Sequence, residues 1–131
     1  MKKTGILNKD ISEVVAGMGH LDMLVVCDAG LPIPGQVRRI DLAVKPGLPC
    51  LVEILEALAS ELKVERLILA EETREISPHV EKAILHIFEG AVVEKISHEE
   101  LKELSHKAVA FIRSGEFTPY ANVILVSGVV F

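Results

Sequence analysis

Residues 23 to 28 read MLVVCD, an apolar run that stops at an aspartate. The run is too short for a helix and is bounded by polar residues, which predicts a strand covered on both faces. Asp28 then stands where this buried strand emerges into the tight turn Ala29-Gly30-Leu31-Pro32. A strand buried on both faces is typical of a sheet with helices on each side, so this stretch favours an α/β fold.

Helices and strands alternate on either side of this strand. Apolar residues recur at three- and four-residue spacing, or follow a capping signal, in stretches that we predict as helices: 8–18, 51–62, 78–88 and 98–104. Short branched or apolar runs predict further strands at 37–44, 67–70, 91–96, 108–112 and 123–126. The alternation predicts one domain over residues 1–131, a three-layer α/β/α sandwich with a mixed, largely parallel sheet. Ligands of such sheets bind beyond the carboxyl ends of the strands.

The composition limits the partners of this chain. Its net charge is −5, and no cluster of Lys or Arg is long enough to follow a phosphate backbone, so nucleic acid is not an expected partner. No apolar run approaches the roughly 20 residues that span a bilayer, and the amino end lacks the order of a signal peptide. We therefore expect a cytoplasmic protein without a membrane segment.

Half of the 131 residues are apolar, which is a high share for a small monomer with a large exposed surface. The carboxyl end from Val123 to Phe131 is mostly apolar, whereas a free terminus is normally polar. Both features indicate a subunit interface, and we expect the carboxyl end to be buried.

Cysteine and histidine spacing argues against a metal site. Cys27 and Cys50 match no ligand or redox motif and are predicted to be buried free thiols. His98 and His106 are eight residues apart, which is not the spacing of a helical metal pair. We expect no metal and no cofactor. His79, His86 and His106 are predicted to be surface residues.

Three places carry polar groups that suit a site, each with a plainer alternative. Asp28 can grip hydroxyl groups at a strand end, or simply cap its own turn. His20 can exchange a proton near neutral pH, or only stabilise the end of the first helix, which we expect Gly19 to stop in left-handed geometry. The loop 113–122 can hold a neutral polyol through Tyr120 and Asn122, or satisfy its own backbone. The residues alone leave these alternatives open.

Taken together, these segments resemble the ribose pyranase and fucose mutarotase family, often called RbsD/FucU. The marks are Gly19-His20, the Asp28 to Pro32 turn, the run Lys45-Pro46-Gly47-Leu48-Pro49, and the loop from Arg113 to Asn122. The resemblance covers the whole chain. The ribose branch of the family has similar residues at two places, Asp28-Ala29-Gly30-Leu31-Pro32 and Tyr120-Ala121-Asn122. Leu21 departs from the family pattern, which commonly has a small hydroxyl residue after the histidine.

The resemblance implies an isomerase that interconverts the β-pyranose and β-furanose forms of free D-ribose by acid–base ring opening and reclosure. It implies that His20 is the proton donor and that Asp28, His98, Tyr120, Ala121 and Asn122 contact the sugar. It also implies a homo-oligomer, a decamer of two pentamers with sites near subunit contacts. Two alternatives remain, a mutarotase of another sugar such as L-fucose and a non-catalytic sugar-binding accessory protein of a transport system.

Overall fold

The computed structural model describes all of residues 1–131. Five helices and six strands follow one another along the chain: α1 (Lys9–Gly17), β1 (Met23–Cys27), β2 (Arg38–Asp41), α2 (Leu51–Ala59), β3 (Val64–Ala70), α3 (Glu71–Ile76), α4 (Pro78–Ile87), β4 (Val92–Ile96), α5 (His98–Ser105), β5 (Ala110–Arg113) and β6 (Val123–Ser127). The strands form one sheet in the order β2-β5-β1-β6-β3-β4. Only β6 runs antiparallel to its neighbours, β1 and β3, so the predicted mixed and largely parallel sheet is confirmed.

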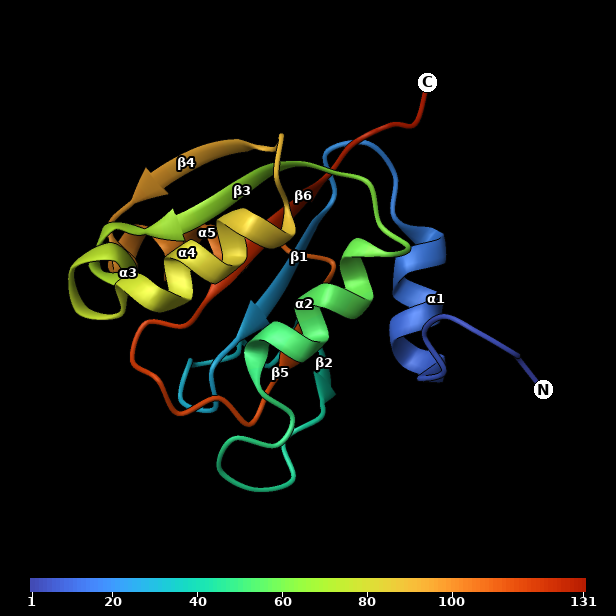
Figure 1. Cartoon of the computed structure of the whole chain (residues 1–131), viewed down its shortest axis with the longest axis horizontal. Helices are drawn as coiled ribbons and strands as arrows, with labels where there is room; N and C mark the ends of the chain where they lie inside the picture. Colours follow the sequence, from blue (N-terminus) through green and yellow to red (C-terminus); the bar gives the residue numbers. More distant parts are fainter.

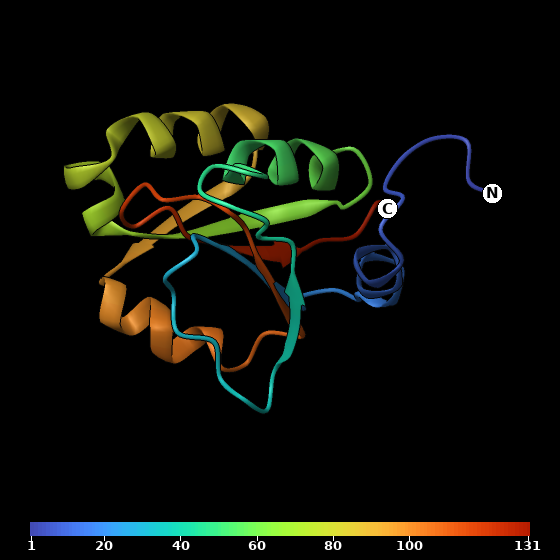
Figure 2. The same cartoon turned by 90° about the horizontal axis from the view of Figure 1, so that it is seen from below.

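Alternate side chains of the central strands enter two separate cores. In β1, Leu24 and Val26 join the larger core under α1, α2 and α4, while Val25 and Cys27 join the smaller core against α5. The same period of two recurs in β3, β5 and β6, as expected for strands covered on both faces. Figure 2 shows the three layers, with α2, α3 and α4 above the sheet and α5 below it.

Local signals explain most of the element boundaries. Asn8 caps α1 by accepting a hydrogen bond from the Ile11 amide, and Ser97 forms a capping box with Glu100 at the start of α5. Pro78 is the first residue of α4, where its missing amide proton costs nothing. The helix prediction over 8–18 and the strand prediction over 23–27 are therefore confirmed, each within a residue or two.

Several expectations need correction. Helix α3 was not predicted, because its six residues bury only Thr73 and carry no apolar stripe. Gly19 does not adopt left-handed geometry; Leu21 does, with φ 70°, as the third residue of the turn from Gly19 to Asp22. Cys50 is only half-buried, because it precedes α2 at the surface.

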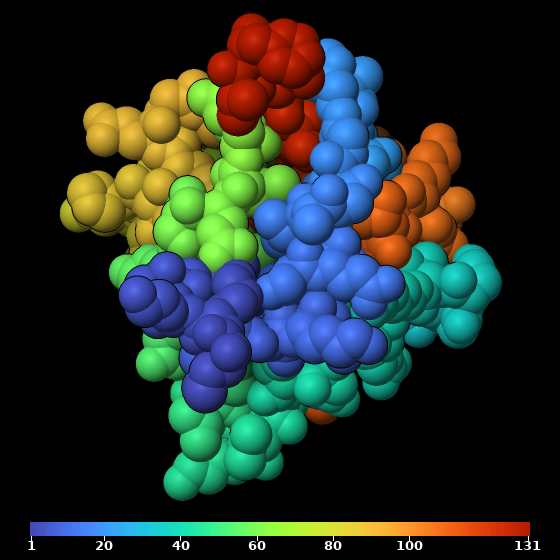
Figure 3. All heavy atoms as spheres, turned by 90° about the vertical axis from the view of Figure 1, so that its right-hand side faces the viewer, coloured from blue at the N-terminus to red at the C-terminus, as the bar shows by residue number.

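The carboxyl end is buried only in part. Strand β6 is buried throughout, but Val129, Val130 and Phe131 are exposed within one chain. Figures 1 and 3 show this tail beside the segment that joins α1 to β1. None of the helices has the length and apolar character needed to cross a membrane.

Candidate functional site

Three segments meet at one edge of the sheet because of the strand directions. Asp28 directly follows β1, and His98 follows β4 after one residue, so both stand at carboxyl ends of parallel strands. Strand β6 runs the opposite way, and its register against β1 pairs Val26 with Val123. The residue before β6, Asn122, is therefore brought beside Asp28. This is the edge where the ligands of α/β sheets bind.

Asp28 and Asn122 are joined by two hydrogen bonds. The Asp28 amide donates to Asn122 Oδ1 at 3.0 Å, and Asn122 Nδ2 donates to Asp28 Oδ2 at 3.1 Å. Asp28 Oδ1 also accepts from the Gly30 amide at 2.9 Å, which is the turn-capping contact expected of an aspartate in such a loop. An ionised carboxylate has about four lone-pair positions. Asp28 thus caps its turn and keeps acceptor capacity for a ligand.

His98 and Tyr120 form an aromatic pair on the far side of the same site. Their ring centroids lie 5.0 Å apart with the planes at 87°, an edge-to-face arrangement. His98 Nδ1 is buried without a hydrogen-bond partner. A buried N–H without an acceptor is costly, so we expect the ring proton of the neutral form on Nε2. His98 then offers one N–H donor to a ligand.

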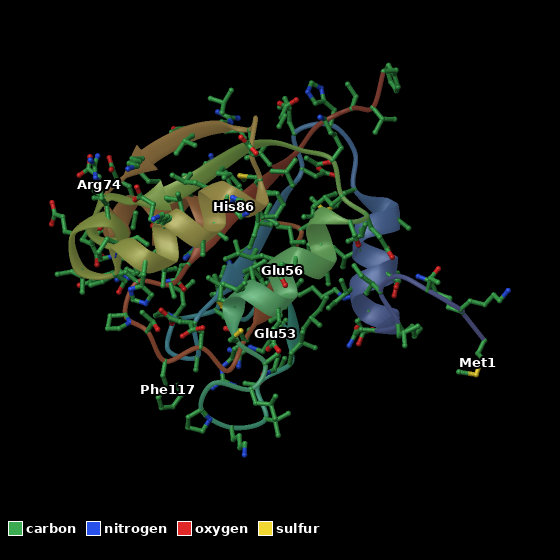
Figure 4. The ribbon with its side chains drawn as sticks, viewed as in Figure 1. Met1, Glu53, Glu56, Arg74, His86 and Phe117 are labelled. Carbon is green, nitrogen blue, oxygen red and sulfur yellow. The ribbon has the colours of Figure 1, made fainter.

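These residues line a cavity of about 310 Å³. Its walls are Asp28, Gly30, Leu31, Pro32, His98, Pro119, Tyr120 and Asn122. A second cavity of about 410 Å³ adjoins it and shares Asp28, Gly30 and Pro119. Arg113, Glu116, Phe117 and Thr118 are among the residues that line the second cavity. Phe117 projects from the loop into solvent (Figure 4).

The site is polar and, on balance, acidic. Burial raises the pKa of Asp28 and outweighs the opposing hydrogen bonds from Gly30 and Asn122. Burial also acts to raise the pKa of Glu116, but hydrogen bonds from Thr118 and nearby amides outweigh it, so the net shift is downward. Arg113 is paired with Asp41 at 3.1 Å. No three His, Cys, Asp or Glu side chains are grouped so as to hold a metal ion.

His20 lies at the opposite edge of the sheet. It precedes β1, whereas Asp28 follows it, and the strand alone spans roughly 13 Å. The imidazole is exposed, and its Nε2 contacts Glu65 Oε2 at 3.1 Å near the start of β3. One chain therefore unites Asp28, His98, Tyr120 and Asn122 but leaves His20 outside the cavity.

The other predicted residues take different places. Ala121 is fully buried, and its side chain joins the larger core, so only its backbone can face a ligand. His79, His86 and His106 are exposed, as predicted. Thr73 and Ser77, whose hydroxyls bond to the main chain of this site, were not predicted to be part of it. Thr73 lies in a stretch with no apolar stripe, and Ser77 was expected only to cap the helix that begins at Pro78, a capping bond that it does not make.

Another hollow of about 300 Å³ lies between the amino-terminal segment and α2. Ile6, Leu7, Ile11, Ile54 and Leu58 are among its mostly apolar walls. It lacks the clustered donors and acceptors that a polar ligand needs. The candidate functional site is therefore the cavity lined by Asp28, His98, Tyr120 and Asn122, which we call the strand-edge cavity.

Known proteins are similar to this chain over its whole length. A D-ribose pyranase of Symbiobacterium thermophilum is 54% identical, and one of Chloroflexus aggregans is 51% identical, each over the full length of both chains. A solved structure described as Bacillus subtilis RbsD complexed with D-ribose superposes with a TM-score of 0.97, at 46% identity and full coverage of both chains. The RbsD / FucU transport protein family matches residues 1–130. This chain belongs to the RbsD / FucU family.

Proposed function

We propose that this protein is an isomerase that interconverts the β-pyranose and β-furanose forms of free D-ribose. The observation that carries the proposal is the strand-edge cavity, where a carboxylate, an imidazole, a phenol and an amide converge without a metal cluster. Such groups match a neutral polyol, which presents many hydroxyls and no charge. Full-length relatives named D-ribose pyranase support the same substrate and reaction.

The reaction requires only proton transfers. One proton is delivered to the ring oxygen while another leaves the anomeric hydroxyl, which opens the ring to the aldehyde. A bond rotates, a different hydroxyl attacks the aldehyde carbon, and the two protons return, so no bond to the protein forms. General acid–base help of this kind is worth about 10²–10⁴-fold in rate.

The residues proposed to contact the sugar each have a role in this scheme. Asp28 accepts hydrogen bonds from sugar hydroxyls, and His98 Nε2 donates one. Tyr120 and Asn122 hold the remaining hydroxyls, while Ala121 contributes only its backbone. The proton donor of the scheme is His20, which one chain leaves at the other edge of the sheet.

We therefore infer that the site is completed by a second copy, whose His20 enters the cavity. Two observations support this. The His20 imidazole is about half exposed, with 51% of its side-chain surface accessible, so it is free to reach outward. Leu21, Val129 and Val130 are exposed apolar residues in the same region, which suits a contact between subunits.

The first experiment measures exchange between ribose ring forms by NMR magnetisation transfer. We expect the wild type to accelerate exchange and His20→Ala to reduce it by at least about 10²-fold. Equal rates in the two proteins would remove His20 from the chemistry. A panel with L-fucose in the same assay tests the alternative of another sugar, and ribose binding without acceleration would point to a non-catalytic accessory protein.

The second experiment mixes two inactive variants, His20→Ala and Asp28→Ala. If each site takes His20 from one subunit and Asp28 from another, random assembly restores about a quarter of the sites. If both groups came from the same chain, every site would keep one defect and the mixture would stay inactive. Cytoplasmic location remains a prediction from the sequence, and assembly as a decamer remains an implication of the family resemblance.

A further inference from the structure

Two buried hydroxyl groups hold the loop that carries Tyr120. Thr73 Oγ1 donates to the Tyr120 carbonyl at 2.8 Å, and Ser77 Oγ donates to the Pro119 carbonyl at 2.7 Å. Thr73 is fully buried and Ser77 is 1% exposed. Hydroxyls withdrawn from water in this way are bound to a partner, and here both partners are backbone atoms of the cavity wall.

The loop needs such support because Tyr120 has a backbone φ of 59°. Residues with a Cβ rarely adopt this left-handed conformation, and they keep it only where the surroundings hold them there. The backbone N–H of Asn122 also donates to the Tyr120 carbonyl, at 2.9 Å. The Thr73 hydroxyl therefore reaches the carbonyl of the residue that turns the chain between Pro119 and Asn122.

The Ser77 hydroxyl bonds to the Pro119 carbonyl instead of capping a helix, which is the usual role of a serine at this position. Ser77 occupies the cap position of α4, ahead of Pro78, where a serine normally accepts a hydrogen bond from the first turn. No such bond is made here. Its hydroxyl points to the loop instead, so the helix start contributes to the site rather than to its own cap.

Glu72, which lies next to Thr73 on α3, contacts His98, the other member of the aromatic pair. Its Oε2 accepts a hydrogen bond from the His98 amide at 2.8 Å. Figures 1 and 2 show the loop before β6 close to α3. Arg74 lies on the opposite, outer side of α3 and points into solvent (Figure 4). One helix thus contacts both segments that carry the cavity's aromatic rings.

We propose that α3 and its junction with α4 position the sugar site, with Thr73 and Ser77 as positioning residues that act through the main chain of Pro119 and Tyr120. The proposal rests on the proposed function for its substrate. Tyr120 and Asn122 contact sugar hydroxyls before and during ring opening, so their displacement weakens binding of all states alike. Such a loss raises KM and leaves kcat nearly unchanged.

The test compares Thr73→Val, which replaces the hydroxyl by a methyl group, with Thr73→Ser, which keeps the hydroxyl. Ser105→Ala is the matched control, because Ser105 is also a buried hydroxyl donor to a backbone carbonyl but lies at the far end of α5 from His98. The chain has one tyrosine and no tryptophan. The near-ultraviolet circular dichroism of tyrosine therefore reports on Tyr120 alone.

We expect Thr73→Val to raise KM for ribose about tenfold with kcat within about twofold of wild type, and to change the tyrosine signal. Thr73→Ser should restore both, and Ser105→Ala should alter neither. Wild-type KM and tyrosine signal in Thr73→Val would overturn the proposal, as would a failure of Thr73→Ser to recover them. If Thr73→Val does not fold, Ser77→Ala carries the same comparison.

The proposed function and the positioning role of Thr73 and Ser77 can be disproved independently of each other. A wild type that does not accelerate ring exchange contradicts the proposed function. The positioning role is then decided by the tyrosine signal of the variants and by ribose binding measured directly, neither of which requires catalysis.

Discussion

Asp28 and Asn122 form a tightly specified pair, because the two hydrogen bonds between them require one acceptor and one donor on the Asn122 side chain. The amide oxygen of Asn122 accepts from the Asp28 backbone, and its NH₂ group donates to the carboxylate. Neither a flipped amide nor an ionised carboxylate at position 122 can satisfy both contacts. The pair ties the end of β1 to the start of β6, and so links the fold to the site.

Asn122→Asp should therefore destabilise the protein in a pH-dependent way. It replaces the donor by a second carboxylate facing Asp28, which adds like-charge repulsion and an unpaired acceptor, worth about 1–3 kcal/mol of unfolding free energy at neutral pH. Acidification protonates one carboxyl and restores an O–H···O contact, so the deficit should shrink. Urea denaturation at neutral and mildly acidic pH measures this; a deficit independent of pH would contradict the repulsion.

The raised pKa of Asp28 predicts how ribose affinity depends on pH. Because burial favours the neutral form, Asp28 takes up its proton above the ordinary aspartate value of about 3.9. Ribose affinity should fall as the pH drops through that raised pKa, since the protonated acid is a weaker acceptor. Titration of ribose binding by isothermal calorimetry over mildly acidic pH tests it.

This loss of affinity should not be confused with unfolding. A group whose pKa is raised on folding adds stability as the pH falls and loses it as the pH rises, so Asp28 itself does not unfold the protein in acid. Glu116 has a lowered pKa, and its stabilising contribution disappears only below the ordinary glutamate value of about 4.3. Protonation of Asp28 should therefore lower ribose affinity without lowering the free energy of unfolding; a loss of both together would contradict the assignment to Asp28.

Among the elements, β1 and α5 could be predicted well from the sequence. An unbroken apolar run admits few conformations, and the Ser97 and Glu100 side chains satisfy the amides that start α5. Helix α3 could not be predicted, because its stability comes from contacts with distant segments rather than from its own pattern. The separation of His20 from Asp28 was implicit in the order along the chain, since residues before and after one strand lie at opposite edges.

Gly115 shows how two loops depend on one missing side chain. A Cβ at this position would lie 2.5 Å from the Leu48 carbonyl oxygen and 2.6 Å from that of Lys45. The close approach allows Gly115 to exchange backbone hydrogen bonds with Gly47 and Pro49, at 2.7 Å and 2.8 Å. The run 45–49 is thereby fixed against the loop that ends in Tyr120 and Asn122.

Gly115→Ala should push these loops apart and cost about 1–3 kcal/mol of unfolding free energy, as overpacking does. Ribose affinity should fall as well, because the loop carries Tyr120 and Asn122, the residues proposed to bind the sugar. Gly35→Ala is the matched control, since a Cβ there meets nothing within 4 Å and should change stability by less than about 0.5 kcal/mol. Thermal unfolding and ribose titration of both variants decide it; equal behaviour would mean that the contact is not required.

At the scale of the whole molecule, the proposed function divides the site between the two edges of one chain's sheet. The groups proposed to hold the sugar lie at one edge, and His20 belongs to the segment that joins α1 to β1 at the other, where Leu21 bonds to Ser127 and the tail Val129 to Phe131 lies alongside. Two copies that bring unlike edges together form a heterologous contact, and such contacts generate closed rings when the rotation closes. A site shared between copies would require a heterologous contact of this kind, and the decamer of two pentamers implied by the family resemblance stays a prediction.

Removing Val129 to Phe131 tests this arrangement. The last backbone hydrogen bond of the chain is donated by Gly128 to Lys63 at 2.8 Å, so the tail beyond it contributes little to the fold of one chain. We expect the truncated protein to keep its far-ultraviolet circular dichroism, to show a lower mass by light scattering, and to lose ring exchange in proportion to dissociation. Dilution of the truncated protein should lower activity per subunit further. A truncated protein with unchanged mass and activity would place the subunit contact elsewhere, and one that stays assembled but inactive would show that the tail acts on the His20 side of the site itself.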